Sequence, residues 1–175
     1  MPDRTEATPE RAGPRPVLRA AAADDVESIA RLWHAGWQDG HLGHVPAELT
    51  KHRSLADFRR RVPARIDQTT VAVVDGRVVG FVTVHEDEVE QIYVATPARG
   101  GGVAGELLQH GERVVAASHD TAWLAVASGN ARARRFYERS GWHDTGAVDY
   151  QAEIDGGTFT VPCRRYEKRV RRLDA

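Results

Sequence analysis

Cysteine is nearly absent from this sequence, and so are long apolar runs. The single cysteine, Cys163, excludes an intramolecular disulfide framework and a zinc site built from several cysteines. The longest uncharged apolar runs, such as residues 122–127, are far too short to span a bilayer, so no membrane partner is expected. The first residues are charged and have no apolar stretch of the kind found in signal peptides, which predicts a cytoplasmic protein.

An excess of charge of one sign is lacking too. The sequence has 24 basic and 25 acidic residues, a net charge of −1, which argues against a nucleic-acid partner. The C-terminal end is an exception, because basic residues gather there: Arg164, Arg165, Lys168, Arg169, Arg171 and Arg172. This cluster indicates either a solvated last strand and tail or a contact for phosphate or an acidic partner.

The length of 175 residues favours a single domain. Residues 1–15 contain three prolines and few side chains to bury, which predicts a disordered N-terminal arm. We therefore expect one folded domain over residues 16–168, followed by a basic C-terminal tail over residues 169–175.

Two helices are predicted in the first third of the chain. The first is expected to start at Asp24, with Glu27 three residues later as in a capping box. Its apolar side chains recur on one helical face: Val26, Ile29, Ala30, Trp33 and Trp37. Residues 39–51 are expected to form a loop. Ser54 begins the second helix, which Pro63 should kink or divide.

The strongest local signal is the dipeptide Asp75-Gly76 between two β-branched runs, which predicts a type I′ hairpin of residues 69–74 and 77–85. A helix over residues 102–118 is expected to place Val103, Leu107, Gly111 and Val114 on one face. The other predicted elements are strands at 17–20, 88–95 and 122–127, a helix at 130–140, and a closing hairpin of 142–154 and 158–168. Together they predict an α/β fold, a mixed and mostly antiparallel sheet of about seven strands flanked on both faces by about four helices.

A glycine-rich loop, residues 96–102, lies between the strand at 88–95 and the helix that follows it. Glycines let backbone N–H groups converge, and the start of a helix adds positive potential, so the loop suits a pyrophosphate. The alternative is a glycine-rich turn without a ligand. Gly100, Gly102 and Gly105 formally fit the dinucleotide fingerprint, but four residues separate the strand from the first glycine, unlike a Rossmann unit. A P-loop is excluded because no Gly-Lys-Ser/Thr is present.

The same residues resemble the GNAT superfamily of acetyl-CoA-dependent N-acetyltransferases. Its signature, Gln/Arg-x-x-Gly-x-Gly/Ala between a strand and a helix, is matched by residues 99–104. A second family pattern after the next strand is matched in register by Asn130, Ala133, Phe136, Tyr137 and Gly141. Trp142 stands where the family usually has Phe. The resemblance covers about residues 17–168, is specific over 69–142, and agrees with the predicted order of elements.

The resemblance implies acetyl-CoA as acyl donor and assigns residues to it. Backbone amides around Ile92, Tyr93 and Val94 would hold its pantetheine arm. Arg99 would lie near the phosphates, and the pyrophosphate would meet the amides of Gly100, Gly101, Gly102, Val103, Ala104 and Gly105. Asn130 would contact the cofactor arm, and Tyr137 would lie near the sulfur.

Direct attack by an amine needs a base, because an alkyl ammonium with a pKa of about 10.4 is only about 1 part in 2,500 neutral at pH 7. Glu86, Glu88 and Glu90 would alternate on one face of an extended strand. By its distance from Arg99, Glu88 resembles the family position that often serves as base. The alternative is a solvated strand face. Tyr137 is the candidate acid for the leaving thiolate, with a packing role as its alternative.

The acceptor site is the least specified part of the chain. Trp37, His41, Glu86 and Glu90 are candidates to bind the acceptor, and the spacing His41-x-x-His44 does not predict a metal site because it lies in a loop. We expect transfer of an acetyl group to a primary amine of a small molecule. The alternatives are a non-catalytic acyl-CoA-binding module and acetylation of a protein or peptide amine. The resemblance also allows a homodimer, because many members of the superfamily dimerise.

Overall fold

The computed structural model describes residues 13–171. Most of the predicted N-terminal arm and residues 172–175 of the predicted tail lie outside the described residues. The α-helices are α1 (Val26–His41), α2 (Ala47–Thr50), α3 (Leu55–Arg61), α4 (Val103–Ala116) and α5 (Ala131–Arg139). The strands are β1 (Val17–Ala20), β2 (Thr69–Val74), β3 (Arg77–His85), β4 (Glu88–Val94), β5 (Thr121–Ala127), β6 (His143–Ile154) and β7 (Gly157–Arg169). Short 3₁₀ helices span Ala23–Asp25, Val62–Gln68 and Thr96–Ala98.

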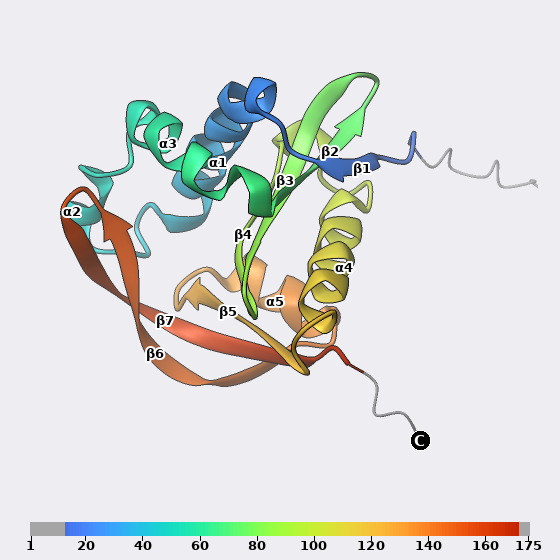
Figure 1. The fold of residues 1–175 in the computed structure, drawn as a ribbon. Helices are drawn as coiled ribbons and strands as arrows, with labels where there is room; N and C mark the ends of the chain where they lie inside the picture. The colour runs from blue at the N-terminus through green and yellow to red at the C-terminus, as the bar shows by residue number, and fades with distance from the viewer. Residues whose placement is uncertain (1–12, 172–175) are drawn as a thin grey trace, which may run out of the picture.

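The strands form one mixed sheet in the order β1-β2-β3-β4-β5-β7-β6 (Figure 1). All neighbours pair antiparallel except β4 and β5, which are parallel. The predicted fold class is confirmed. Within residues 13–171 there is one α-helix more than expected, because the short α2 lies in the segment predicted as a loop.

Apolar layers cover both faces of this sheet. One layer packs α1 and α3 against it, with Ile29, Trp33 and Phe58 among its buried members. The other packs α4 and α5, with Leu107 and Tyr137 among its members. The apolar stripe predicted for the first helix is thus in the core.

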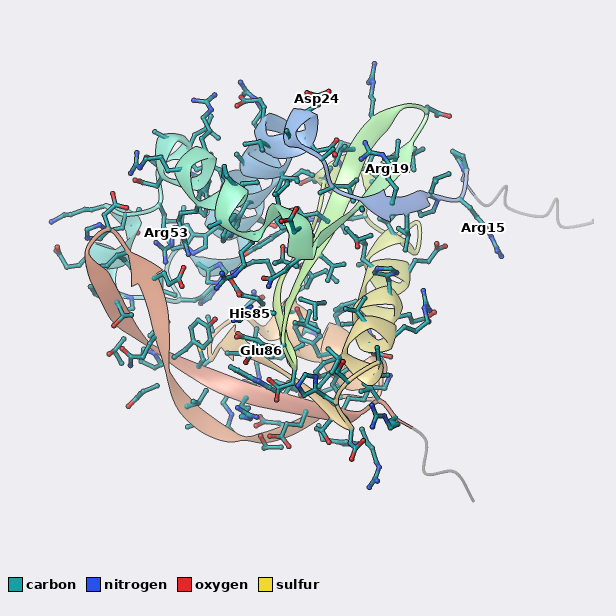
Figure 2. The ribbon with its side chains drawn as sticks, in the orientation of Figure 1. Arg15, Arg19, Asp24, Arg53, His85 and Glu86 are labelled. Carbon is teal, nitrogen blue, oxygen red and sulfur yellow. The ribbon has the colours of Figure 1, made fainter. Side chains whose placement is uncertain are left out.

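Two details of the predicted helices were wrong. In α4, Val114 is 44% exposed and its neighbour Val115 is fully buried, because a period of 3.6 residues carries the buried stripe to Val115 by the end of the helix. The first helix begins at Val26 after a 3₁₀ turn, and Asp24 is exposed beside it (Figure 2). Asp25 makes the stabilising contact at this helix start, because its carboxylate accepts the Ala22 N–H at 2.8 Å.

The predicted start of α3 and the predicted hairpin are confirmed. The Ser54 hydroxyl accepts the Asp57 N–H, and the Asp57 carboxylate accepts the Ser54 N–H in return. Asp75 and Gly76 have φ of 49° and 74°. Positive φ at both central residues is what a type I′ turn requires, and it matches the twist of the two strands.

The β4–β5 junction positions the site. These strands pair at one register position, Glu88 opposite Trp123, and then diverge (Figure 1). A β-bulge in β4 adds to the irregularity, because Val89 and Gln91 pair with consecutive β3 residues and Glu90 is the extra residue between them. The gap between the diverging strands is the only break in an otherwise continuous sheet, among the strands described.

Candidate active site

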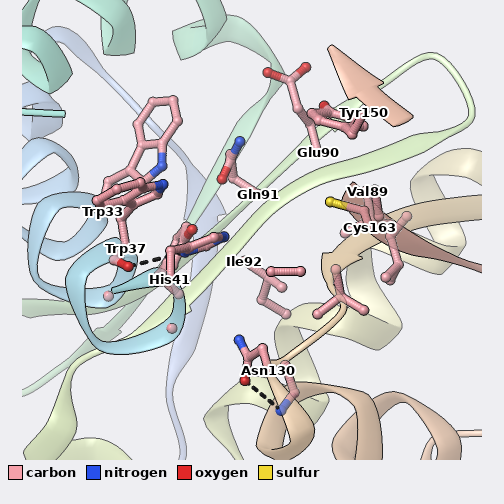
Figure 3. Close-up of a pocket in the computed structure, with 18 of the residues that line it drawn as sticks. Trp33, Trp37, His41, Val89, Glu90, Gln91, Ile92, Asn130, Tyr150 and Cys163 are labelled. Atoms are coloured by element: carbon pink, nitrogen blue, oxygen red, sulfur yellow. Dashed lines mark hydrogen bonds between the residues drawn. The ribbon is translucent and has the colours of Figure 1, made fainter. Parts of the chain in front are cut away.

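A cavity of about 590 Å³ occupies the region where β4 and β5 diverge. Its walls come from α1, β4, β5, α5 and the β6–β7 hairpin. Figure 3 shows Trp37 and His41 of α1 on the left, Ile92 of β4 beside them and Asn130 below. The segments predicted to form the donor and acceptor sites therefore meet at one cavity, although they are distant in the sequence.

The glycine-rich loop leads into the start of α4 at the edge of this cavity. Gly100 and Gly102 have φ of 80° and 85°, a conformation that favours glycine. Gly102 is the N-cap of α4 and provides no side-chain cap, so the first-turn N–H groups are left for an external acceptor. A Cβ at Gly105 would meet no atom within 4 Å. This open, uncapped helix start fits the pyrophosphate of a coenzyme A thioester.

Arg99 of that loop and Arg132 of α5 share one carboxylate. Arg99 Nη1 and Arg132 Nη2 both lie 2.7 Å from Asp39 Oδ2. Hydrogen bonds from Arg132 and then Arg99 hold the pKa of Asp39 below its ordinary value. Arg99 was predicted for the phosphate end. Arg132 and Asp39 were not, although Arg132 lies only two residues after the motif residue Asn130.

Glu88 lies in the cavity wall where β4 and β5 part. The Tyr150 hydroxyl donates a hydrogen bond of 2.8 Å to Glu88 Oε1. Burial raises the pKa of Glu88 to about 7 despite that bond, and the nearby carboxylates of Glu90 and Asp87 act in the same direction. A carboxyl group that titrates near neutrality is suited to accepting and releasing a proton at pH 7.

The three glutamates do not form the row that strict alternation predicts. Glu86 is exposed in the turn between β3 and β4, has φ of 55°, and is not among the cavity-lining residues (Figure 2). Glu90 lines the cavity, but its carboxylate accepts a hydrogen bond of 3.1 Å from Arg65 Nε. The turn and the bulge interrupt the period of two on which the expectation depended.

Tyr137 and Asn130 come from α5 and its N-terminus. Tyr137 is buried, and burial raises the pKa of its hydroxyl above the ordinary value. Its side chain lines the cavity, and within residues 13–171 its hydroxyl has no hydrogen-bond partner. Asn130 lines the cavity as well, and its Oδ1 caps α5 by accepting the Ala133 N–H at 3.2 Å.

The three β4 residues predicted to hold the pantetheine arm have side chains on different faces of the sheet. Ile92 and Val94 pack toward the α4 layer, and Tyr93 packs toward α1. The Tyr93 ring fits against Gly36 of α1 so closely that a Cβ on Gly36 would lie 2.2 Å from it. All three residues border the cavity, with their backbone on the side from which β5 has diverged.

The predicted acceptor residues of α1 also border the cavity. The rings of Trp37 and His41 are stacked 5.3 Å apart, and His41 Nδ1 lies 3.1 Å from the Trp37 carbonyl oxygen (Figure 3). Burial lowers the pKa of His41 to about 4, so its imidazole is neutral at pH 7. Lining residues that sequence reasoning missed include Tyr150 and three arginines on the α3 side, Arg53, Arg61 and Arg65.

Within residues 13–171, no group of three or more His, Cys, Asp or Glu side chains is placed to hold a metal ion. None of the helices described is both long and apolar enough to cross a membrane.

Comparison with known proteins identifies the family. The family model for the acetyltransferase (GNAT) family matches residues 26–142. The chain therefore belongs to the GNAT acetyltransferase family, and it is an acetyl-CoA-dependent N-acetyltransferase that acts on an amine. A sequence comparison with curated proteins finds no match.

Solved structures share the fold at low sequence identity. The GCN5-related N-acetyltransferase from Rhodopseudomonas palustris has a TM-score of 0.70 and 20% identity, over 91% of this chain and 99% of that one. The yncA protein from Salmonella typhimurium, solved with acetyl-CoA, has a TM-score of 0.68 and 15% identity, over 93% and 98%. The paia N-acetyltransferase from Thermoplasma acidophilum, in complex with coenzyme A, has a TM-score of 0.59 and 16% identity, over 88% and 98%.

Proposed function

We propose that this enzyme transfers the acetyl group to a primary amine of a small molecule, with Glu88 as general base and Tyr137 as general acid. The observation that carries the proposal is that both side chains line one cavity, which the glycine-rich loop borders. Acetyl-CoA supplies an activated acetyl thioester. The amides of residues 100–105 would hold its pyrophosphate, with Arg99 nearby, and Asn130 would contact its arm.

Glu88 addresses the most difficult proton transfer. An ammonium with a pKa of about 10.4 must lose a proton before its nitrogen can attack, a handicap of about 4.6 kcal/mol at pH 7. Since burial raises the pKa of Glu88 to about 7, its carboxylate is a stronger base than an exposed glutamate and is still half ionised at neutral pH. Glu88 accepts this proton, directly or through a water, and releases it to solvent afterwards.

Tyr137 addresses the leaving group. As the new C–N bond forms and the C–S bond breaks, the coenzyme A thiolate takes a proton from the Tyr137 hydroxyl, and the second amine proton restores the tyrosine. Burial raises the pKa of this hydroxyl, which keeps it protonated until the thiolate forms. Thiols have pKa values near 8.5, so the transfer is uphill in water by about 2 kcal/mol or more, and Tyr137 assists catalysis without being essential.

The shape of the cavity favours a small acceptor. Trp33 and Trp37 in its α1 wall are each only 5% exposed, and the β6–β7 hairpin forms the opposite wall. A volume of about 590 Å³ is within the range usual for small-molecule sites. Trp37, His41 and Glu90 are the predicted acceptor-binding residues that border this space.

An acceptor screen tests the proposal. Thiol release from acetyl-CoA would be measured with a panel of small primary amines and with peptides bearing free N-termini or lysines, and the N-acetyl products identified by mass spectrometry. We expect the highest kcat/KM with a small amine. Preference for peptides would overturn the acceptor assignment. Acetyl-CoA binding by calorimetry without turnover on any amine would support the non-catalytic alternative.

A further inference from the structure

We infer that the acceptor carries a carboxylate as well as its amine, and that Arg53 and Arg61 form the subsite that binds this carboxylate. The inference rests on the proposed function, because it names the chemical class of the amine. It assigns a role to two cavity-lining cations that the acetyl-transfer chemistry itself does not use.

Arg53 is a buried cation that pairs with no carboxylate among the described residues. It precedes α3, lines the cavity, and is only 5% exposed (Figure 2). Within residues 13–171 its only side-chain hydrogen bond is from Nη1 to the His52 carbonyl oxygen at 2.9 Å. A guanidinium has five N–H donors, and burying it without an opposite charge is costly. A ligand anion in the cavity would supply the missing charge.

Arg61 is a second cation in the same wall. It lies on α3, its guanidinium carbon is 4.8 Å from the centroid of the Trp33 ring, and it has neither a hydrogen bond nor an ion pair with any described residue. Burial, together with the nearby charge of Arg61, lowers the pKa of Arg53 to about 10. Both arginines line the same cavity, so an anion bound there would offset the charge of this wall.

The carboxylates around this pair are already engaged or exposed. Glu90 accepts a hydrogen bond from Arg65 Nε at 3.1 Å. Glu153 is 65% exposed and lies 3.8 Å from Arg65. Asp57 is bound by Ser54 and Arg60. Arg65 is thus balanced within the protein, whereas Arg53 and Arg61 provide positive charge in excess.

The donor end of the cavity has its own cations. Arg99 and Arg132 are held by Asp39 beside the glycine-rich loop, on elements that follow β4 and begin α5. Arg53 and Arg61 line the cavity from the α3 side instead. The planar fork of a guanidinium matches a carboxylate in bidentate geometry. An acceptor whose amine is deprotonated by Glu88 and whose carboxylate binds these guanidinium groups is an aminocarboxylic acid.

Matched acceptors test this inference in the wild-type enzyme. Each set contains an aminocarboxylic acid, its carboxamide and the amine without the carboxyl group, and the sets vary the number of carbons between amine and carboxylate. We expect one acid to exceed its amide in kcat/KM by about 10- to 100-fold, the size of a charge-assisted hydrogen bond. Equal or better use of the amides or simple amines would overturn the inference and leave the proposed function intact. Absence of turnover on every member would overturn both.

Variants then locate the subsite. Arg53→Met and Arg61→Met remove the charge and keep much of the volume, and Arg59→Met is the control, because Arg59 lies on the same helix but pairs with Glu27 outside the cavity. We expect the ratio of acid to amide kcat/KM to fall toward one in the first two variants, mainly through KM, and to persist in the control. A structural role would lower both kcat/KM values together and leave the ratio unchanged. Arg53→Lys should retain part of the ratio, and its loss of fold by circular dichroism would contradict a ligand-binding role.

Discussion

Replacing Glu88 with Gln should change how the stability of the protein depends on pH. Gln keeps the shape of the side chain, and its carbonyl oxygen can still accept the hydrogen bond from the Tyr150 hydroxyl, which is 2.8 Å long in the wild type. The substitution removes only the titration. Any difference in pH dependence between variant and wild type therefore reports the environment of this one carboxyl group.

The sign and size of this pH-dependent change in stability follow from the raised pKa of Glu88. The folded chain holds the Glu88 proton more tightly than the unfolded chain, so the stabilisation is complete below the unfolded pKa and is lost as pH rises through the folded pKa. A pKa of about 7 in the folded protein against 4.5 in the unfolded chain corresponds to about 3.4 kcal/mol, of which about 2.5 kcal/mol is lost between pH 5 and pH 8.

Urea unfolding followed by tryptophan fluorescence at pH 5 and pH 8 measures this quantity. The wild type should lose about 2.5 kcal/mol more than Glu88→Gln over that interval. His41 works in the opposite direction, because its lowered pKa of about 4 removes stability as pH falls below 6.5, but it is common to both proteins and cancels. Glu86→Gln, in the exposed turn, is the control and should behave as wild type. If the change in the free energy of unfolding between pH 5 and pH 8 agreed within about 0.5 kcal/mol in wild type and Glu88→Gln, it would refute a buried carboxyl group with a raised pKa at position 88.

Substitutions at three further positions test other parts of the site. Tyr137→Phe should lower kcat by about 10- to 100-fold with the Kd for acetyl-CoA unchanged, and an unchanged kcat would remove its role as acid. Gly105→Glu should weaken acetyl-CoA binding in calorimetry by more than about 10-fold through charge repulsion. Gly105→Ala should retain binding and stabilise α4 by up to about 1 kcal/mol. Equal binding by both variants would contradict the phosphate site. Gly36→Ala should lower the free energy of unfolding by about 1–2 kcal/mol despite its better helix propensity, because the new Cβ overlaps the Tyr93 ring, and an unchanged urea midpoint would contradict that close packing.

Local sequence patterns were enough to predict much of the fold. Asp75-Gly76 determines its turn because few other residues tolerate positive φ at both central positions. The apolar stripe of α1 is buried because helical periodicity by itself identifies a core-facing side. The motif residues Arg99 and Asn130 were found through family resemblance, and both border the cavity.

Contacts between distant segments could not be predicted in the same way. Tyr150 meets Glu88 across 62 positions of sequence, and Arg132 meets Asp39 across 93. Nothing in the local sequence of either partner specifies such a pairing. Glu86 and Glu90 show a different failure, because one turn and one bulge changed the direction of side chains that regular alternation would have aligned.

The pH dependence of kcat/KM with the preferred acceptor, in wild type, Glu88→Gln and Glu86→Gln, tests the central claim that Glu88 is the base of this cavity. For wild type and Glu86→Gln, the account predicts a rise with pH that bends near pH 7, where Glu88 becomes ionised. For Glu88→Gln it predicts a rate lower by about 10²- to 10⁴-fold at pH 7 and no bend there. A profile for Glu88→Gln that coincides with the wild-type profile would contradict the account.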